Sequence, residues 1–128
     1  MEKIKAVVVE AGKPARIEEV ENSLQGFYKT IGCNCIECVY PFDGDVCMIC
    51  EEEGKLNGSK LNRMLKDECG KLYDVIFGTF LIVGYGKDAE FKTLTDEEAE
   101  SFRKLYEEPD EESEMIKQIF LSKWFSIT

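Results

Sequence analysis

Apolar residues near the N-terminus form two short segments separated by turn residues. Lys3–Glu10 alternates and then runs into three successive valines, and it is closed by Gly12 and Pro14. A β-branched segment bounded in this way predicts a core strand. Ala15–Val20 alternates between apolar and polar residues, so it predicts the hairpin partner of that strand.

The middle of the chain has the same character. Asn34–Tyr40 predicts a strand that Pro41 ends, and Asp43–Asp45 predicts a tight turn from which Val46–Cys50 returns antiparallel. The acidic residues after Cys50 and the pair Asn57-Gly58 predict two further turns.

Leu72–Val83 is the most apolar stretch, and Gly78 interrupts it. A continuous strand of this length would be unusual, so we expect one strand over Leu72–Phe77, a bend or bulge near Gly78, and a second strand over Phe80–Val83. The glycines at 84 and 86 end it.

Helical spacing of apolar residues predicts four helices. The first spans about Ser23–Ile31, with Asn22 and Gln25 as a weak capping pair and Gly32 as its stop. The second is a short helix over Ser59–Leu65 that Ser59 caps.

The third helix begins at Thr95, with Glu98 at the reciprocal capping position. Glu107–Glu114 then predicts an acidic connector, and apolar residues from Met115 to Phe125 predict a last helix. The apolar face of that helix packs either on the core of its own subunit or on a neighbouring subunit, and the second alternative would give a homo-oligomer.

These elements predict an α+β fold: a mainly antiparallel sheet of five or six strands, with one early helix and two C-terminal helices packed on one face. We expect a core domain over residues 1–106. Residues 107–128 form the connector and the C-terminal amphipathic helix.

Charge narrows the classes of partner. The chain has 128 residues and a formal charge of −10, and residues 93–128 hold ten acids and four bases. Clustered Lys and Arg are needed to bind nucleic acid without sequence preference, so we expect no direct nucleic-acid binding, whereas a basic protein partner fits. No apolar run is long enough for a membrane span and no signal peptide is recognisable, so we expect no membrane contact and a cytoplasmic location.

Six cysteines and the absence of histidine limit the chemistry. The spacings C-x-C-x-x-C and C-x-x-C raise a zinc site, but strand alternation places Cys47 and Cys50 on opposite faces. We therefore expect structural buried thiols and no metal. Without histidine there is no triad, and the acidic run at 51–53 is typical of a solvated turn, so we predict no catalytic residues, no cofactor and no enzyme activity.

One region reverses the charge of the chain, because Gly54–Lys71 holds five bases against two acids. Arg63 is the candidate anchor for a phosphate-bearing ligand, since a guanidinium fork suits bidentate phosphate contacts. The other candidate ligand-binding residues are Asn62, Lys55, Lys60, Lys66, Tyr40, Asp74 and Thr79. The structural alternative is that Arg63 pairs with Asp74 or with an acid of the 51–53 turn.

The chain resembles a family of small proteins of unknown function that are encoded mainly by phages, plasmids and other mobile elements of bacteria. The resemblance lies in an ordered set of segments: Glu10–Lys13, Ile36–Phe42, Glu52–Lys55, Leu61–Arg63, Leu72–Gly84 and the helix start Leu94–Glu97. It implies an origin in a phage or mobile element and a bacterial host cytoplasm, and it gives no catalytic residues.

Two functions follow as hypotheses. The leading one is a non-enzymatic phage accessory protein that binds a small anionic, nucleotide-like ligand and so counters bacterial defence signalling. The alternative is an acidic inhibitor that binds a host protein through the C-terminal third, in the manner of a nucleic-acid mimic.

Overall fold

The computed structural model describes residues 2–52, 59–67 and 69–127. Its elements, in chain order, are β1 (Lys3–Val9), β2 (Arg16–Glu21), α1 (Leu24–Ile31), β3 (Ile36–Val39), β4 (Val46–Glu51), β5 (Leu61–Lys66), β6 (Leu72–Phe77), β7 (Phe80–Tyr85), β8 (Phe91–Lys92), α2 (Asp96–Leu105) and α3 (Glu112–Ile127).

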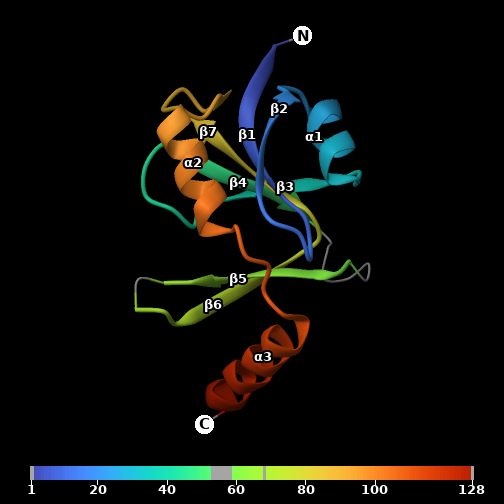
Figure 1. The fold of residues 1–128 in the computed structure, drawn as a ribbon, viewed down its shortest axis with the longest axis vertical. Coiled ribbons are helices and arrows are strands. Elements are labelled where there is room, and N and C mark those ends of the chain that lie inside the picture. Colours follow the sequence, from blue (N-terminus) through green and yellow to red (C-terminus); the bar gives the residue numbers. More distant parts are fainter. Residues whose placement is uncertain (1, 53–58, 68, 128) are drawn as a thin grey trace.

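Six strands form one antiparallel sheet in the order β2-β1-β7-β4-β3, and the short β8 also pairs with β7 (Figure 1). The central strands β1, β4 and β7 are buried on both faces, which explains why they are nearly continuous apolar runs. One early helix and two C-terminal helices complete the architecture, so the predicted α+β fold is confirmed.

Each face of the six-stranded sheet has its own apolar core. On one face, Phe27 and Ile31 of α1 pack with Val8 and Leu81 of the central strands. On the other face, α2 packs on the sheet, and the two-stranded ribbon β5–β6 packs beside it through Leu65 and Ile76 (Figure 1). The ribbon thus covers part of the sheet where a second helix would otherwise be needed.

The ribbon corrects one prediction. Residues 61–66 form the strand β5, paired antiparallel with β6, so the short helix predicted over Ser59–Leu65 is wrong. The pairing partner lies in the later apolar segment, and long-range pairing overrides a weak local capping signal. The predicted break at Gly78 is confirmed, since Gly78 has a φ of +80° and separates β6 from β7, which lie in different sheets.

Capping residues set the helix boundaries. Ser23, not Asn22, caps α1, because its hydroxyl accepts a 3.0 Å hydrogen bond from the Gly26 amide, whereas the Asn22 side chain donates to the Phe91 carbonyl. Gly32 ends α1 in the left-handed conformation, as predicted. The capping box of α2 is also confirmed, with reciprocal Thr95 and Glu98 bonds of 3.1 and 2.9 Å.

The last helix begins at Glu112, inside the segment predicted as connector. Met115 is buried, and α3 packs mainly on β5 and β6, on the side of the ribbon away from the six-stranded sheet (Figure 1). The two C-terminal helices therefore do not share one face. Within the described ranges, no helix has the length and apolar character needed to cross a membrane.

Candidate functional site

Asn62 and Arg63 are adjacent in sequence and both buried, at 0% and 1% exposure. A β-bulge explains this, because Leu61 pairs with Phe77 and Arg63 with Ile76, which leaves Asn62 as an extra residue. A bulge re-aims side chains that would otherwise alternate between faces. Both polar side chains are thereby directed into the junction between the ribbon and the six-stranded sheet.

The Arg63 guanidinium is bonded on both terminal nitrogens. Nη2 donates to the carbonyls of Lys13 and Tyr106 at 2.6 and 2.9 Å, and Nη1 donates to the Asn62 side chain at 2.8 Å. None of these acceptors is a carboxylate, and Nε has no partner among the described atoms. Burial lowers the pKa of Arg63, and the nearby Asp110 carboxylate opposes that shift.

Asn62 completes the same buried cluster. Its amide donates to the carbonyls of Val9 and Gly78 at 2.9 and 2.8 Å, while its oxygen accepts from Arg63. Together the two residues tie the ribbon to β1, to the turn after β1 and to the end of α2. Asn62 and Arg63 therefore have a structural role, and their predicted ligand-binding role is not favoured by this burial.

The other residues of the predicted ligand set are dispersed. Lys60 and Thr79 line a cleft of about 350 Å³, which Lys13 also lines, whereas Lys66 lies on a different cleft. Lys55 lies outside the described residues.

Tyr40 and Asp74 lie elsewhere again. Tyr40 is 58% exposed, and its ring contacts that of Tyr85 at a centroid distance of 5.5 Å. The hydrogen bond with Tyr85 and burial raise the pKa of Tyr40 to about 12. Asp74 lines a narrow cleft of about 100 Å³ beside Cys50. The fold thus does not gather the predicted set around one cavity.

The cysteines divide by burial. Cys47 and Cys50 are buried on opposite faces of β4, as predicted, and burial raises the pKa of each thiol to about 12. Cys35 is exposed, so the expectation of a buried thiol is wrong for this residue. Cys69, which lies outside the segments predicted as strands around the other cysteines, is exposed as well. Across the described part of the chain, no three Cys, Asp or Glu side chains are placed to hold one metal ion.

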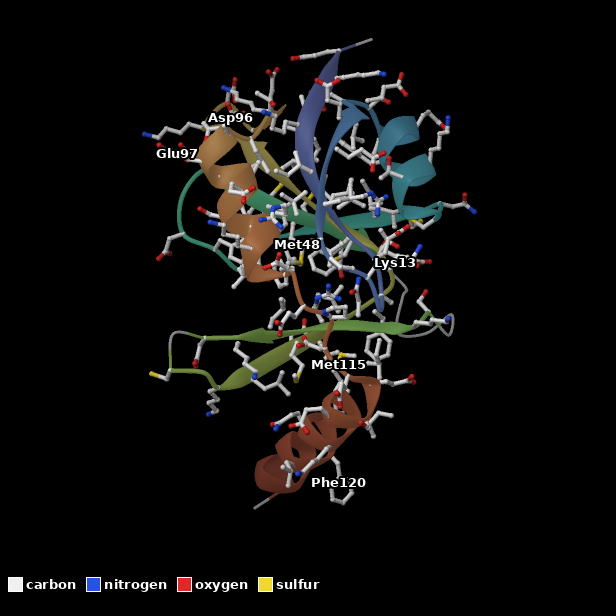
Figure 2. All side chains as sticks on the ribbon, in the orientation of Figure 1. Lys13, Met48, Asp96, Glu97, Met115 and Phe120 are labelled. Carbon is white, nitrogen blue, oxygen red and sulfur yellow. The ribbon has the colours of Figure 1, made fainter. Side chains whose placement is uncertain are left out.

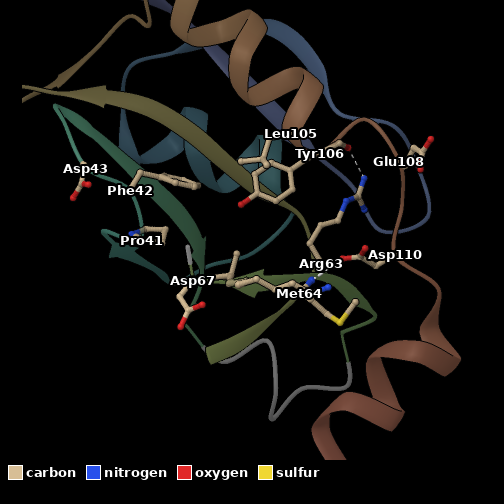
Figure 3. A pocket seen from close by; sticks show the side chains of 12 residues that line it. Pro41, Phe42, Asp43, Arg63, Met64, Asp67, Leu105, Tyr106, Glu108 and Asp110 are labelled. Atoms are coloured by element: carbon tan, nitrogen blue, oxygen red, sulfur yellow. Dashed lines mark hydrogen bonds between the residues drawn. The ribbon is translucent and has the colours of Figure 1, made fainter. Parts of the chain in front are cut away.

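A larger cleft, of about 590 Å³, opens between the ribbon and the end of α2 (Figure 3). Its apolar wall comes from Pro41, Phe42 and Leu105, and Leu105 is 59% exposed. The Phe42 ring packs on the Phe102 ring of α2 at a centroid distance of 4.7 Å, which fixes the 41–43 loop beside the helix. Four carboxylates also line the cleft: Asp43, Asp67, Glu108 and Asp110.

Two of these carboxylates are fully available. Asp43 and Glu108 are exposed and make no ion pair or hydrogen bond with any residue that the structure describes. Asp67 accepts from the amides of its own turn, and Asp110 accepts from the Met64 amide at 2.8 Å. Lys66 is the exposed cation on the lining, since Arg63 is buried. Met64, Leu65 and Tyr106 complete the lining. We call this cleft the acid-rimmed cleft, and its charge favours a cationic group beside an apolar one.

Sequence reasoning missed this cleft. No local pattern marks Phe42 or Leu105 as lining a cleft, and Glu108 falls in the segment predicted as an acidic connector. The cleft exists only because residues 41–43, 63–67 and 105–110 meet in the fold. The weak signal available was the run of carboxylates directly after an apolar helix end.

A family model described as a domain of unknown function, DUF3846, matches residues 4–107. No curated protein and no solved structure matches the chain. The match ends at the beginning of the acidic connector, so it covers the six-stranded sheet, the ribbon and α2 but not α3.

Proposed function

The chain belongs to the DUF3846 family of domains of unknown function, and on the basis of its acid-rimmed cleft we propose that it is a non-enzymatic protein that binds a basic segment of another protein. One observation carries the proposal: the exposed Leu105 side chain lies in a cleft whose exposed carboxylates include Asp43 and Glu108. A Lys or Arg side chain has the matching chemistry, because its aliphatic stem packs on an apolar wall while its charged end reaches carboxylates.

The charge of the whole chain supports the same class of partner. At −10, it attracts cationic surfaces over a distance of about one Debye length, roughly 10 Å at 0.1 M salt. Such attraction speeds the encounter and selects against acidic partners. In keeping with the resemblance to proteins of mobile elements, we place the protein in the cytoplasm of a bacterial host, where it inhibits a host protein by covering its basic surface.

The test is retention of host proteins from a bacterial extract on the immobilised full-length chain. Asp43→Asn with Glu108→Gln removes two cleft charges, and Glu19→Gln with Glu90→Gln removes two exposed charges elsewhere. We expect a basic protein to be retained at about 0.05 M salt by the wild type and by the control pair, and to be released by the cleft pair or at about 0.5 M salt. Equal retention by both double variants would contradict the proposal.

The smaller cleft beside Lys60 favours a second candidate, the binding of a small anionic ligand. Lys13, Lys60 and Thr79 line it and supply two cations and a hydroxyl. Glu10 and Glu51 line it as well, and the C-terminus of α1 is adjacent, which places partial negative charge there. Those groups make it the weaker candidate. Native mass spectrometry of the purified chain tests it, with retained nucleotide mass that Lys60→Ala abolishes as the supporting result.

A further inference from the structure

Helix α3 has apolar side chains on two faces. Met115 is 1% exposed and packs at the junction with the ribbon, whereas the next residue, Ile116, is 54% exposed. Phe120 is 66% exposed and stands four residues after Ile116, which places both on one side of the helix. We call Ile116 and Phe120 the outer stripe.

The outer stripe is exposed, and its Phe120 faces away from the rest of the protein. Figure 2 shows Met115 where α3 meets the ribbon and Phe120 farther along the helix, pointing away from the ribbon. The body of α3 extends beyond the ribbon, and the C-terminus lies at the far end of the molecule from the N-terminus (Figure 1). Large apolar side chains exposed at helical spacing are typical of a surface that packs against another element.

The surroundings of the outer stripe specify the partner's charge. Glu111, Glu112 and Glu114 precede it and are exposed, and Lys117 is the only base from 107 to 121. The i,i+4 ridge of one helix packs between the ridges of another helix. A second copy packed in parallel would bring the acids of 107–114 against one another, whereas a basic helix would meet opposite charge at this end of α3.

From these observations we infer that the outer stripe of α3 docks an amphipathic helix that carries Lys or Arg beside its apolar face. The choice of a basic partner rests on the proposed function, but the surface is separate from the acid-rimmed cleft. Apolar side chains at the centre of such a contact carry most of its affinity, and the adjacent carboxylates set its charge preference.

The probe is a synthetic amphipathic peptide with leucines on one face and lysines on the other, titrated into the full-length chain by calorimetry. Ile116→Ala with Phe120→Ala removes the outer stripe. Leu24→Ala is the matched control, because Leu24 is an equally exposed apolar residue, at 56%, on helix α1. We expect the stripe variant to bind the peptide about tenfold or more weakly and the control to bind like the wild type.

Control peptides and a cleft variant distinguish binding at the outer stripe from binding at the acid-rimmed cleft. A peptide of the same composition in scrambled order should bind weakly, and so should one with glutamates in place of lysines. If Asp43→Asn with Glu108→Gln abolishes binding while the stripe variant keeps it, the peptide occupies the acid-rimmed cleft; the inference then fails and the proposed function stands. If the stripe variant alone loses binding but the extract experiment shows no cleft dependence, the inference stands and the proposed function fails.

Self-association is tested in the same material. Sedimentation equilibrium without peptide should show a monomer for both the wild type and the stripe variant. A dimer that the stripe variant dissociates would overturn the inference, because a second copy would then cover this surface. Circular dichroism and thermal unfolding of each variant establish that the exposed substitutions leave the fold intact.

Discussion

At the scale of single residues, the Asn62–Arg63 pair shows what sequence reasoning captured and what it did not. The sequence drew attention to Arg63 as the strongest donor in a basic stretch. Two of its acceptors are main-chain carbonyls of Lys13 and Tyr106, 50 and 43 residues away, which no local pattern reports. A charged side chain that is almost fully buried needs such acceptors to offset its lost hydration.

Replacing Arg63 with Ala should therefore lower the free energy of unfolding by about 3 kcal/mol, since charge-assisted bonds are lost and buried carbonyls remain unsatisfied. Chemical denaturation measures this. Lys66→Ala, an exposed site on the same strand, should change it by no more than about 0.5 kcal/mol. An Arg63→Ala protein as stable as the Lys66→Ala protein would show that the buried bonds do not stabilise the fold.

The thiols offer a second test at this scale. Alkylation at pH 8 followed by mass spectrometry should modify the exposed Cys35 and Cys69 rapidly and leave the buried Cys47 and Cys50 protected. Since burial raises the pKa of Cys47 and Cys50 to about 12 from an ordinary 9.0, the folded state keeps them neutral. Their contribution to stability is full below pH 9 and declines as the pH rises toward 12. Rapid labelling of Cys47 in the native protein would contradict the burial.

At the scale of elements, segments with strong periodicity or a complete cap were predictable. The β1–β2 hairpin, the β3–β4 pair and the start of α2 all follow from local residue order. The strand β5 was not predictable, because its two adjacent buried polar residues break strand alternation and its partner β6 comes later in the chain. The start of α3 within an acidic run was missed because charge suggested a connector, although acids in a first helical turn are favourable.

Gly78 is the position at which the backbone conformation between two strands can be tested by substitution. It has a φ of +80°, joins β6 to β7, and its carbonyl accepts from Asn62. Gly78→Ala should cost about 1–2 kcal/mol, because a Cβ is strained in the left-handed conformation and would lie 3.4 Å from the Ser59 side chain. Gly78→Asn should cost less, since asparagine tolerates this conformation. Thermal unfolding compares the two, and an inverted order would refute the backbone explanation.

At the scale of the whole molecule, composition indicated an acidic protein and the order of elements an α+β fold, but no single segment contained the cleft. The acid-rimmed cleft requires a loop, a ribbon strand and a helix end to meet, and that meeting depends on the sheet order β2-β1-β7-β4-β3. The predicted division at residue 106 stays a prediction. Asp110 bonds the Met64 amide and Met115 is buried at the ribbon, so the C-terminal segment contributes to the packing.

The stability of the protein in acid depends on contacts between elements, because an ion pair can join two elements that are separate in the chain. The Lys5 ammonium hydrogen-bonds Asp96 and links β1 to α2, which lowers the pKa of Asp96 below its ordinary 3.8. The ionised form is favoured in the folded state, so this stabilisation is present above about pH 4 and is lost as the pH falls through the lowered value. The urea midpoint of unfolding should decrease less between pH 7 and pH 3 for Asp96→Asn than for the wild type. Equal falls would mean that this pair contributes nothing.

The position of the ribbon has a consequence for how the family can diversify. β4 and β7 are direct neighbours in the six-stranded sheet, so the chain from 52 to 79 leaves the sheet and returns to the same place. The ribbon is therefore an excursion from one long hairpin, held by Leu65, Ile76 and the buried Asn62–Arg63 cluster. Its tip can lengthen, shorten or acquire new side chains while the sheet keeps its register. Changes in the length or side chains of this segment can thus leave the pairing of β4 with β7 intact.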